Sequence, residues 1–139
     1  INLRKKNENI IRKHPIYKNK IILLKGSSTD TNIIKKIKSI VRNARTMVIL
    51  DSNHTESHVF EELNLYSKIV SKKNYLIVQD TGIIHMPEKL NKNRNWSKKN
   101  NPYTAVKKFL KKNKKFKIDS DIYEKIYFSA SPDGFLIKK

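Results

Sequence analysis

The chain has 139 residues, a mass of 16.4 kDa and a formal net charge of +19 at pH 7. This length fits one domain with a buried core. Because the chain has no cysteine, it forms neither a disulfide nor a thiolate metal site, which excludes a disulfide-stapled secreted scaffold. No apolar run approaches the roughly 20 residues of a membrane-spanning helix, so we expect a soluble protein in the reducing cytoplasm.

The positive charge has two interpretations. A pI near 10.1 is typical of proteins that bind nucleic acid or another anionic partner. However, only 5 of the 31 basic residues are arginine, which makes forked contacts with phosphate and guanine, and the lysines are spread over several elements. The abundance of Lys, Asn and Ile, which have codons rich in A and T, is also what base-composition drift produces. We therefore favour a solvated basic surface over a nucleic-acid interface.

Three elements are predicted in the first part of the chain. Residues 5–13 form a short polar helix that ends before Pro15. Residues 21–24 are a continuous apolar run ending at Gly26, as expected of a strand buried on both faces. Asp30 then caps an amphipathic helix, and its apolar stripe consists of Ile33, Ile34, Ile37, Ile40 and Val41.

The middle of the chain predicts a strand, a helix and a second strand. Residues 47–50 and 75–78 are apolar strands that end in polar residues. The helix between them has apolar residues at spacings of three and four, namely Val59, Phe60, Leu63, Tyr66, Ile69 and Val70.

The remainder begins with an irregular segment over residues 81–101, which we interpret as a loop or lid that can include one helical turn. Asn101 and Pro102 are a typical cap and first residue of the helix that follows. Three short strands are predicted to close the chain, and the last two pair as a terminal antiparallel hairpin; they cover residues 116–118, 126–130 and 135–137.

This alternation of strands and helices predicts a single α/β domain with a mostly parallel sheet covered by helices on both faces. Ligands of such sheets bind beyond the carboxyl ends of the strands. The polar residues expected at that edge are Ser27, Ser28, Asp51, Gln79 and Asp80.

Asp51 and Asp80 come together at this edge if their strands are neighbours. Two carboxylates at one site repel each other unless they share a proton or a cation. Carboxylates, with the amide oxygen of Gln79, suit Mg²⁺ or a similar ion. The alternative interpretation is that each aspartate caps the helix that follows it.

Other chemistry has weaker support. His54 and His58 are four residues apart, but no third zinc ligand is evident, and His54 is better interpreted as a residue at the rim of the site. No serine lies between glycines as in a nucleophile elbow, which disfavours a hydrolase. Only three glycines are present, so the chain has no glycine-rich phosphate or dinucleotide loop. Trp96 could stack on a base or sugar, but more often such a residue anchors its loop to the body.

Several segments resemble the cephalosporin hydroxylase and rhamnosyl O-methyltransferase family. They are residues 25–30 (KGSSTD), 48–59 (VILDSNHTESHV), 75–81 (YLIVQDT), 105–110 (AVKKFL) and 131–136 (SPDGFL). The resemblance implies a three-layer, Rossmann-like methyltransferase that uses S-adenosylmethionine and a metal site similar to that of catechol O-methyltransferase. The implied reaction is Mg²⁺-assisted O-methylation of a sugar or another hydroxylated small molecule, such as a glycan, a glycolipid or a secondary metabolite.

The resemblance also implies roles for individual residues. Asp51, Gln79 and Asp80 would bind the metal, although the family usually has Glu at the position of Gln79, and His54 would accept the proton. The turn that contacts the adenine end of the cofactor would be Gly26, Ser27, Ser28 and Thr29, and Asp51 and Ser52 would contribute further cofactor contacts.

The amino terminus departs from the family pattern. The first strand, the glycine-containing cofactor loop and the acidic residue for the ribose hydroxyls have no counterpart, and residues 1–4 resemble the end of the second strand. We therefore expect residues 1–139 to be the carboxyl-terminal two-thirds of the methyltransferase domain. Two alternatives stay open, an inactive partial methyltransferase and a basic module that binds nucleic acid or acidic polysaccharide. A homo-oligomer also stays open.

Overall fold

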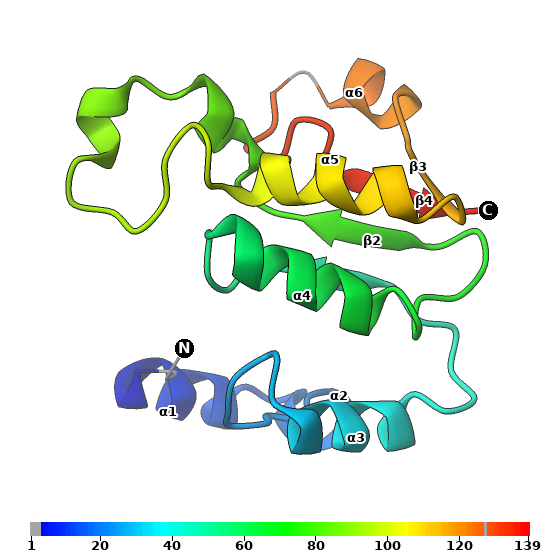
Figure 1. Cartoon of the computed structure of the whole chain (residues 1–139). Helices are drawn as coiled ribbons and strands as arrows, with labels where there is room; N and C mark the ends of the chain where they lie inside the picture. The colour runs from blue at the N-terminus through cyan, green and yellow to red at the C-terminus, as the bar shows by residue number, and fades with distance from the viewer. Residues whose placement is uncertain (1–3, 127) are drawn as a thin grey trace.

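The computed structural model describes residues 4–126 and 128–139 and confirms the α/β class (Figure 1). The helices are α1 (Lys5–Lys13), α2 (Tyr17–Lys20), α3 (Thr31–Ile40), α4 (Glu56–Tyr66), α5 (Pro102–Lys112) and α6 (Asp121–Lys125). The strands are β1 (Val48–Leu50), β2 (Tyr75–Val78), β3 (Phe116–Ile118) and β4 (Phe135–Lys138). None of the described helices is long and apolar enough to cross a membrane.

The four strands form one mixed sheet in the order β1-β2-β4-β3. β1 and β2 are parallel, with Leu50 opposite Val78, whereas β4 is antiparallel to both β2 and β3. The expectation of a mostly parallel sheet is therefore wrong for the described strands. The reason is that β4 inserts between β2 and β3, an arrangement that depends on contacts distant in sequence.

The predicted strand over residues 21–24 is also wrong. This segment is extended but has no strand partner among the described residues, and Ile22 is 65% exposed. An apolar run predicts burial on both faces, but a strand also needs a neighbour with which to exchange backbone hydrogen bonds. Without that neighbour the segment remains an irregular connection between α2 and α3.

The predicted strand over residues 126–130 is not formed either. Residues 126 and 128–130 are irregular, and Tyr127 lies outside the described residues. Both edges of β4 are already paired, with β2 on one side and β3 on the other, so a hairpin partner has no edge to occupy. The turn itself is present, because the Gly134 N–H donates to the Ser131 carbonyl oxygen.

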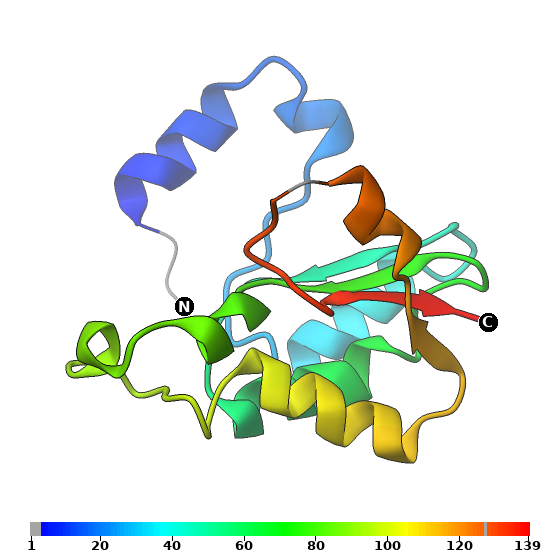
Figure 2. The same cartoon turned by 90° about the horizontal axis from the view of Figure 1, so that it is seen from above.

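The core lies between the sheet and the helices α4 and α5, which pack side by side on one face (Figures 1 and 2). Figure 2 shows α6 on the opposite side of the sheet. The amphipathic patterns predicted these buried faces correctly, and the fully buried side chains include Leu63, Leu76, Val106, Phe109 and Leu136.

Both predicted helix caps are present. The Asp30 carboxylate accepts hydrogen bonds from the backbone N–H groups of Asn32 and Ile33 at the start of α3. Asn101 and Thr104 form a reciprocal capping box at the start of α5, which has Pro102 as its first residue. These caps fix where the two helices begin.

Candidate active site

The parallel pairing of β1 and β2 sets the geometry of the site. Because Leu50 lies opposite Val78, the polar residues that follow the two strands emerge at the same edge of the sheet. There Asp51, His54 and Asp80 each present a ligand atom, and these three atoms all lie within 4.8 Å of one another. The structure thus brings together two predicted metal ligands and the predicted proton acceptor.

His54 faces the two carboxylates. Its Nε2 atom lies 2.9 Å from Oδ2 of Asp80 and 3.8 Å from Oδ1 of Asp51, and its side chain is 20% exposed. The Asp80 oxygen is close but lies off the direction of a hydrogen bond, so the buried Nε2 has no hydrogen-bond partner among the described residues. The edge of Trp96 packs against the ring, with centroids 4.9 Å apart, and restricts its orientation.

This donor set fits a divalent cation. Two carboxylates and an imidazole nitrogen without a hydrogen-bond partner converge on one point, an arrangement that a shared positive charge stabilises. Asp51 and Asp80 retain 63% and 40% of their side-chain exposure, which leaves room for water or an acceptor oxygen beside them.

The capping alternative does not describe these aspartates. Thr55, rather than Asp51, is the cap residue of α4. Asp80 precedes the short 3-10 helix η1 (Thr81–His85), but its side chain makes no capping hydrogen bond. Its backbone has a φ of 57° in the left-handed region, a conformation that Asp tolerates and that often occurs at functional sites. Helix capping therefore does not occupy the carboxylates of Asp51 and Asp80, and they remain available for a ligand.

Gln79 lies beside this cluster with its amide oxygen already engaged. Its Oε1 atom accepts a hydrogen bond of 2.8 Å from the hydroxyl of Ser131, which is 1% exposed. Its backbone N–H donates to the Leu50 carbonyl oxygen and continues the pairing of β2 with β1. The assignment of Gln79 as a metal ligand stays a prediction.

A buried polar cluster joins the two segments predicted to bind the cofactor. Nε2 of His58 lies 3.0 Å from Oγ of Ser28 and 3.1 Å from Oγ of Ser52. The Ser52 hydroxyl donates a 2.7 Å hydrogen bond to Glu62, which is 1% exposed. The cluster therefore fixes the turn that contains Ser28 against the end of β1.

Sequence reasoning missed this cluster. The spacing of four between His58 and Glu62 places both on one face of α4, and that is the signal that could have indicated it. His54 and His58 lie in different surroundings, since His54 faces Asp80 and His58 faces the two serines. The weak zinc interpretation of this pair has no support in the structure.

The turn predicted to contact the cofactor is held closely against α3 and α4. Gly26 has a φ of 148°, and a Cβ atom there would lie 2.8 Å from Cγ1 of Ile33. The hydroxyls of Ser27 and Thr29 are 3.1 Å apart. The Tyr66 hydroxyl donates to the Ser28 carbonyl oxygen at 2.9 Å, and burial together with the nearby Glu62 raises the pKa of Tyr66.

A cavity of about 190 Å³ adjoins the acidic cluster and includes His54 and Asp80 in its wall. The segment over residues 81–101 forms the rest of the wall. This segment contains two short 3-10 helices, η1 and η2 (Glu88–Asn91), one more than the single helical turn that the sequence suggested. Asn91 is 8% exposed, and both polar atoms of its amide lack a hydrogen-bond partner among the described residues. The wall of the cavity thus combines apolar side chains with the charged Arg94 and with a buried amide that has no hydrogen-bond partner among the described residues.

Comparisons with known proteins identify the family of the chain. The sequence profile of the Rhamnosyl O-methyltransferase/CmcI family matches residues 1–139. Proteins named rhamnosyl O-methyltransferase from Mycobacterium bovis (strain BCG / Pasteur 1173P2) and Mycobacterium tuberculosis (strain ATCC 25618 / H37Rv) are each 27% identical over 121 residues. These matches cover 85% of this chain and 47% of each relative, so the chain spans about half the length of the relatives it matches. No solved structure matches the chain significantly. The chain belongs to the rhamnosyl O-methyltransferase/CmcI family.

Proposed function

We propose that the protein takes part in methyl transfer from S-adenosylmethionine to a hydroxyl oxygen of a sugar or another small acceptor, assisted by a divalent metal ion. The observation that carries this proposal is the convergence of Asp51, His54 and Asp80 at the carboxyl ends of two parallel strands in a member of this family. The names of the relatives support a sugar hydroxyl as acceptor.

Asp51 and Asp80, with Gln79 beside them, are the residues that would hold Mg²⁺ or a similar ion. When bound, such an ion supplies Lewis-acid stabilisation of an acceptor oxygen that loses its proton. Mn²⁺ is a good alternative to Mg²⁺, because carboxylate, carbonyl and water oxygens suit both ions.

His54 is our candidate for the group that accepts the proton of the acceptor hydroxyl. Its buried Nε2 atom has no hydrogen-bond partner among the described residues, and the residue lines the cavity beside the carboxylates. The Asp80 carboxylate at 2.9 Å would stabilise the positive charge that the ring gains with the proton. Contact with Trp96 holds the ring in this orientation.

The small cavity is the candidate site for the acceptor. The apolar side chains of Ile83, Met86 and Leu90 can pack against the carbon face of a sugar ring. The Asn91 amide, which has no hydrogen-bond partner within residues 4–126 and 128–139, can bond the hydroxyls of the sugar. The segment over residues 81–101 would act as the lid over this acceptor. On the other side of the acidic cluster, Ser52 and the turn from Gly26 to Thr29 would contact S-adenosylmethionine.

The test is binding of Mn²⁺ and of S-adenosylmethionine to the protein as its gene encodes it, measured by electron paramagnetic resonance and calorimetry. We expect Asp51→Asn and Asp80→Asn each to weaken Mn²⁺ binding about tenfold or more, because each removes one charged ligand. The matched control is Asp121→Asn, which removes the same charge from the exposed start of α6 and should leave Mn²⁺ affinity unchanged. If the unmodified protein binds neither Mn²⁺ nor S-adenosylmethionine, the proposal is wrong.

A further inference from the structure

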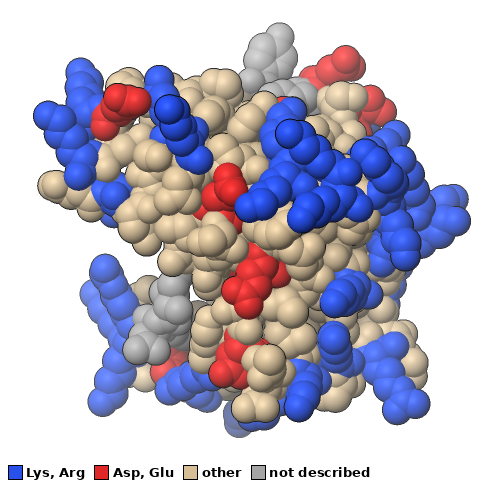
Figure 3. All heavy atoms as spheres, viewed as in Figure 1, with Lys and Arg blue, Asp and Glu red and all other residues tan. Residues whose placement is uncertain are grey.

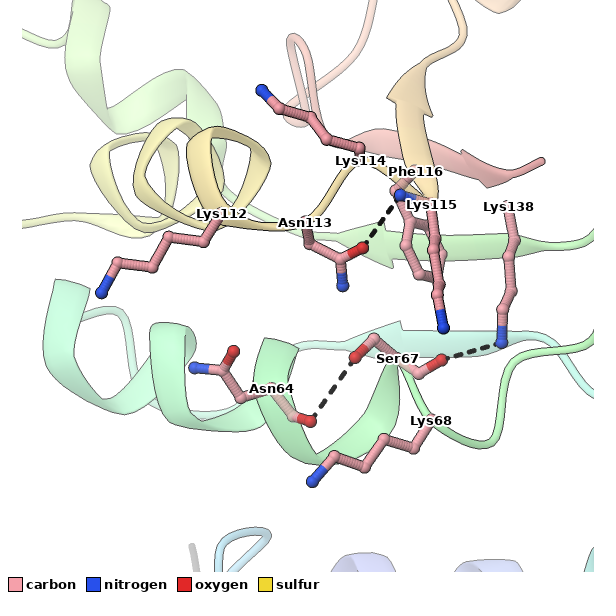
Figure 4. A pocket seen from close by; sticks show the side chains of 9 residues that line it. All are labelled: Asn64, Ser67, Lys68, Lys112, Asn113, Lys114, Lys115, Phe116 and Lys138. Carbon is pink, nitrogen blue, oxygen red and sulfur yellow. Dashed lines mark hydrogen bonds between the residues drawn. The ribbon is translucent and has the colours of Figure 1, made fainter.

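A second cavity lies at the far end of the helices that border the candidate active site. Its volume is about 760 Å³, and five lysines line it together with neutral side chains (Figure 4). The five are Lys68, Lys112, Lys114, Lys115 and Lys138.

This cavity is separate from the acidic cluster. Helix α4 begins at Glu56, directly after the segment that carries His54, and ends at Tyr66, next to Ser67 in the cavity wall. A helix of 11 residues is about 16 Å long, so the helix separates the two sites by roughly that distance. A ligand in the lysine pocket would therefore not touch the proposed metal site.

The pocket has an excess of positive charge. No acidic side chain lines it, and none of its five lysines forms an ion pair with a described residue. The segment over residues 107–117 alone has seven lysines and no acid. Figure 3 shows the resulting concentration of basic side chains over the carboxyl-terminal end of α5 and the neighbouring strands.

The negative partial charges at nearby helix ends do not explain why five lysines line the pocket. The pocket borders the carboxyl-terminal ends of α4 and α5, and each such end carries about half a negative charge. Lys138 interacts with the end of α4, since its ammonium group donates hydrogen bonds to the carbonyl oxygens of Ser67 and Val70 at 3.1 and 2.6 Å. Two helix ends offset about one charge of the five, so most of the positive charge is uncompensated.

The remaining donors are available to a ligand. The ammonium groups of Lys68, Lys112 and Lys115 donate no hydrogen bond to any described residue, and that of Lys112 lies 5.7 Å from the centroid of the Phe60 ring. Asn113 accepts a 3.0 Å hydrogen bond from the Lys115 N–H through its amide oxygen, and Figure 4 shows its amide nitrogen pointing into the pocket. Burial, together with the charge of Lys115, lowers the pKa of Lys138, as expected where cations are crowded.

The chemistry of the wall identifies the class of ligand. Lysine ammonium groups act as point charges that bind phosphate, and five of them around one pocket suit a ligand that carries several negative charges close together. Phe116 is the aromatic residue of the wall, and at 4% exposure it offers no surface on which a base could stack. We propose that the lysine pocket binds a ligand with several phosphate groups, either a soluble oligophosphate or the phosphorylated headgroup of a lipid.

The test uses tripolyphosphate as the probe, in a calorimetric titration of the protein with a chelator present so that the acidic cluster holds no metal. The variant Lys112→Gln/Lys115→Gln removes two charges from the pocket, and Lys35→Gln/Lys36→Gln removes two from the exposed face of α3. We expect the pocket variant to bind tripolyphosphate about tenfold more weakly and the α3 variant to bind it within about twofold of the unmodified protein. Binding should also weaken as salt rises.

A second arm distinguishes the two sources of phosphate. This arm measures co-sedimentation of the protein with phosphatidylcholine vesicles that contain a phosphoinositide. If the unmodified protein co-sediments and only the pocket variant does so less, the ligand is a lipid headgroup. If the protein binds tripolyphosphate but not the vesicles, the ligand is soluble. Absence of tripolyphosphate binding overturns the proposal. The proposal is also overturned if both double variants weaken tripolyphosphate binding equally. It is overturned as well if an RNA oligonucleotide binds more tightly than tripolyphosphate and both variants weaken that RNA binding equally. Circular dichroism checks that both variants are folded.

Discussion

The hydroxyl of Ser131 donates a hydrogen bond to the side-chain amide oxygen of Gln79, and the two atoms lie 2.8 Å apart. This bond connects the turn before β4 to the residue that precedes Asp80. Because Ser131 is a buried donor, it can bond a carboxylate at position 79 as well as an amide. The surroundings of Gln79 are therefore compatible with the Glu that the family resemblance implies for this position.

The first prediction concerns this position. Gln79→Glu should tighten Mn²⁺ binding by about tenfold, because it adds a negative charge next to Asp51 and Asp80. Electron paramagnetic resonance of free Mn²⁺ in a titration measures the change. Gln79→Met, which keeps the approximate volume but removes the oxygen, serves as the control and should weaken binding. An unchanged affinity in both variants would place residue 79 outside the metal site.

The second prediction concerns pH and the contact between α4 and α5. Hydrogen bonds from Thr104 and then Lys108, whose ammonium group lies 3.0 Å from the carboxylate, hold the pKa of Glu56 below its ordinary value of 4.5. A lowered folded-state pKa stabilises the fold above the unfolded-state pKa, and this contribution is lost as pH falls through the folded-state value. Glu56→Gln should therefore lower the free energy of unfolding at pH 7 by about 0.2–1 kcal/mol.

Urea denaturation at a series of pH values measures this effect. The difference between Glu56→Gln and the unmodified protein should shrink as the pH falls below about 4.5 and disappear once Glu56 is protonated in both states. Glu61→Gln, on the exposed side of the same helix, is the control. A difference that stays constant down to acid pH would show that the charge of Glu56 contributes nothing.

The third prediction concerns Gly134. A Cβ atom at this position would lie 2.3 Å from the Val78 carbonyl oxygen, a distance that requires the backbone to move. The same residues are joined by a 2.8 Å hydrogen bond from the Val78 N–H to the Gly134 carbonyl oxygen. Gly134→Ala should therefore lower the free energy of unfolding by about 3 kcal/mol, by separating β2 from β4.

Gly82→Ala provides the comparison for this substitution. Its added Cβ would meet the Ala130 carbonyl oxygen at 3.0 Å, a contact that a small shift can relieve, so its effect should be clearly smaller. Denaturant unfolding measures both variants. If the free energy of unfolding of Gly134→Ala lies within about 0.5 kcal/mol of that of the unmodified protein, the close approach of β4 to β2 described above is wrong.

Local patterns in the sequence predicted the four longer helices, α1, α3, α4 and α5, and the caps of α3 and α5, but they missed the short helices α2 and α6. Asp30 and Asn101 cap α3 and α5 as their positions indicated, because capping depends on only a few neighbouring residues. The meeting of Asp51 and Asp80 followed from the assumption that their strands are parallel neighbours, which the pairing of β1 with β2 confirms.

Features that depend on distant contacts were not predictable in this way. The apolar run that includes Ile22 predicted a strand, but pairing needs a neighbouring strand, which no local pattern specifies. Glu62 is an acid on an amphipathic helix, and its burial depends on Ser52 and His58 being brought beneath it. The lysine pocket likewise needs Lys68 and Lys138 to join lysines near residue 113.

The outer side of β1 influences how the molecules behave in solution. No described strand pairs with this side, and Ile49 and Met47 are each 53% exposed next to it. Unpaired backbone groups beside apolar side chains attract further extended segments, including those of other copies. The net charge of +19 keeps such copies apart through mutual repulsion, which acts over about 10 Å at 0.1 M salt and over shorter distances as salt increases. For residues 1–139 alone, we therefore expect association of copies through this edge to increase as the salt concentration rises.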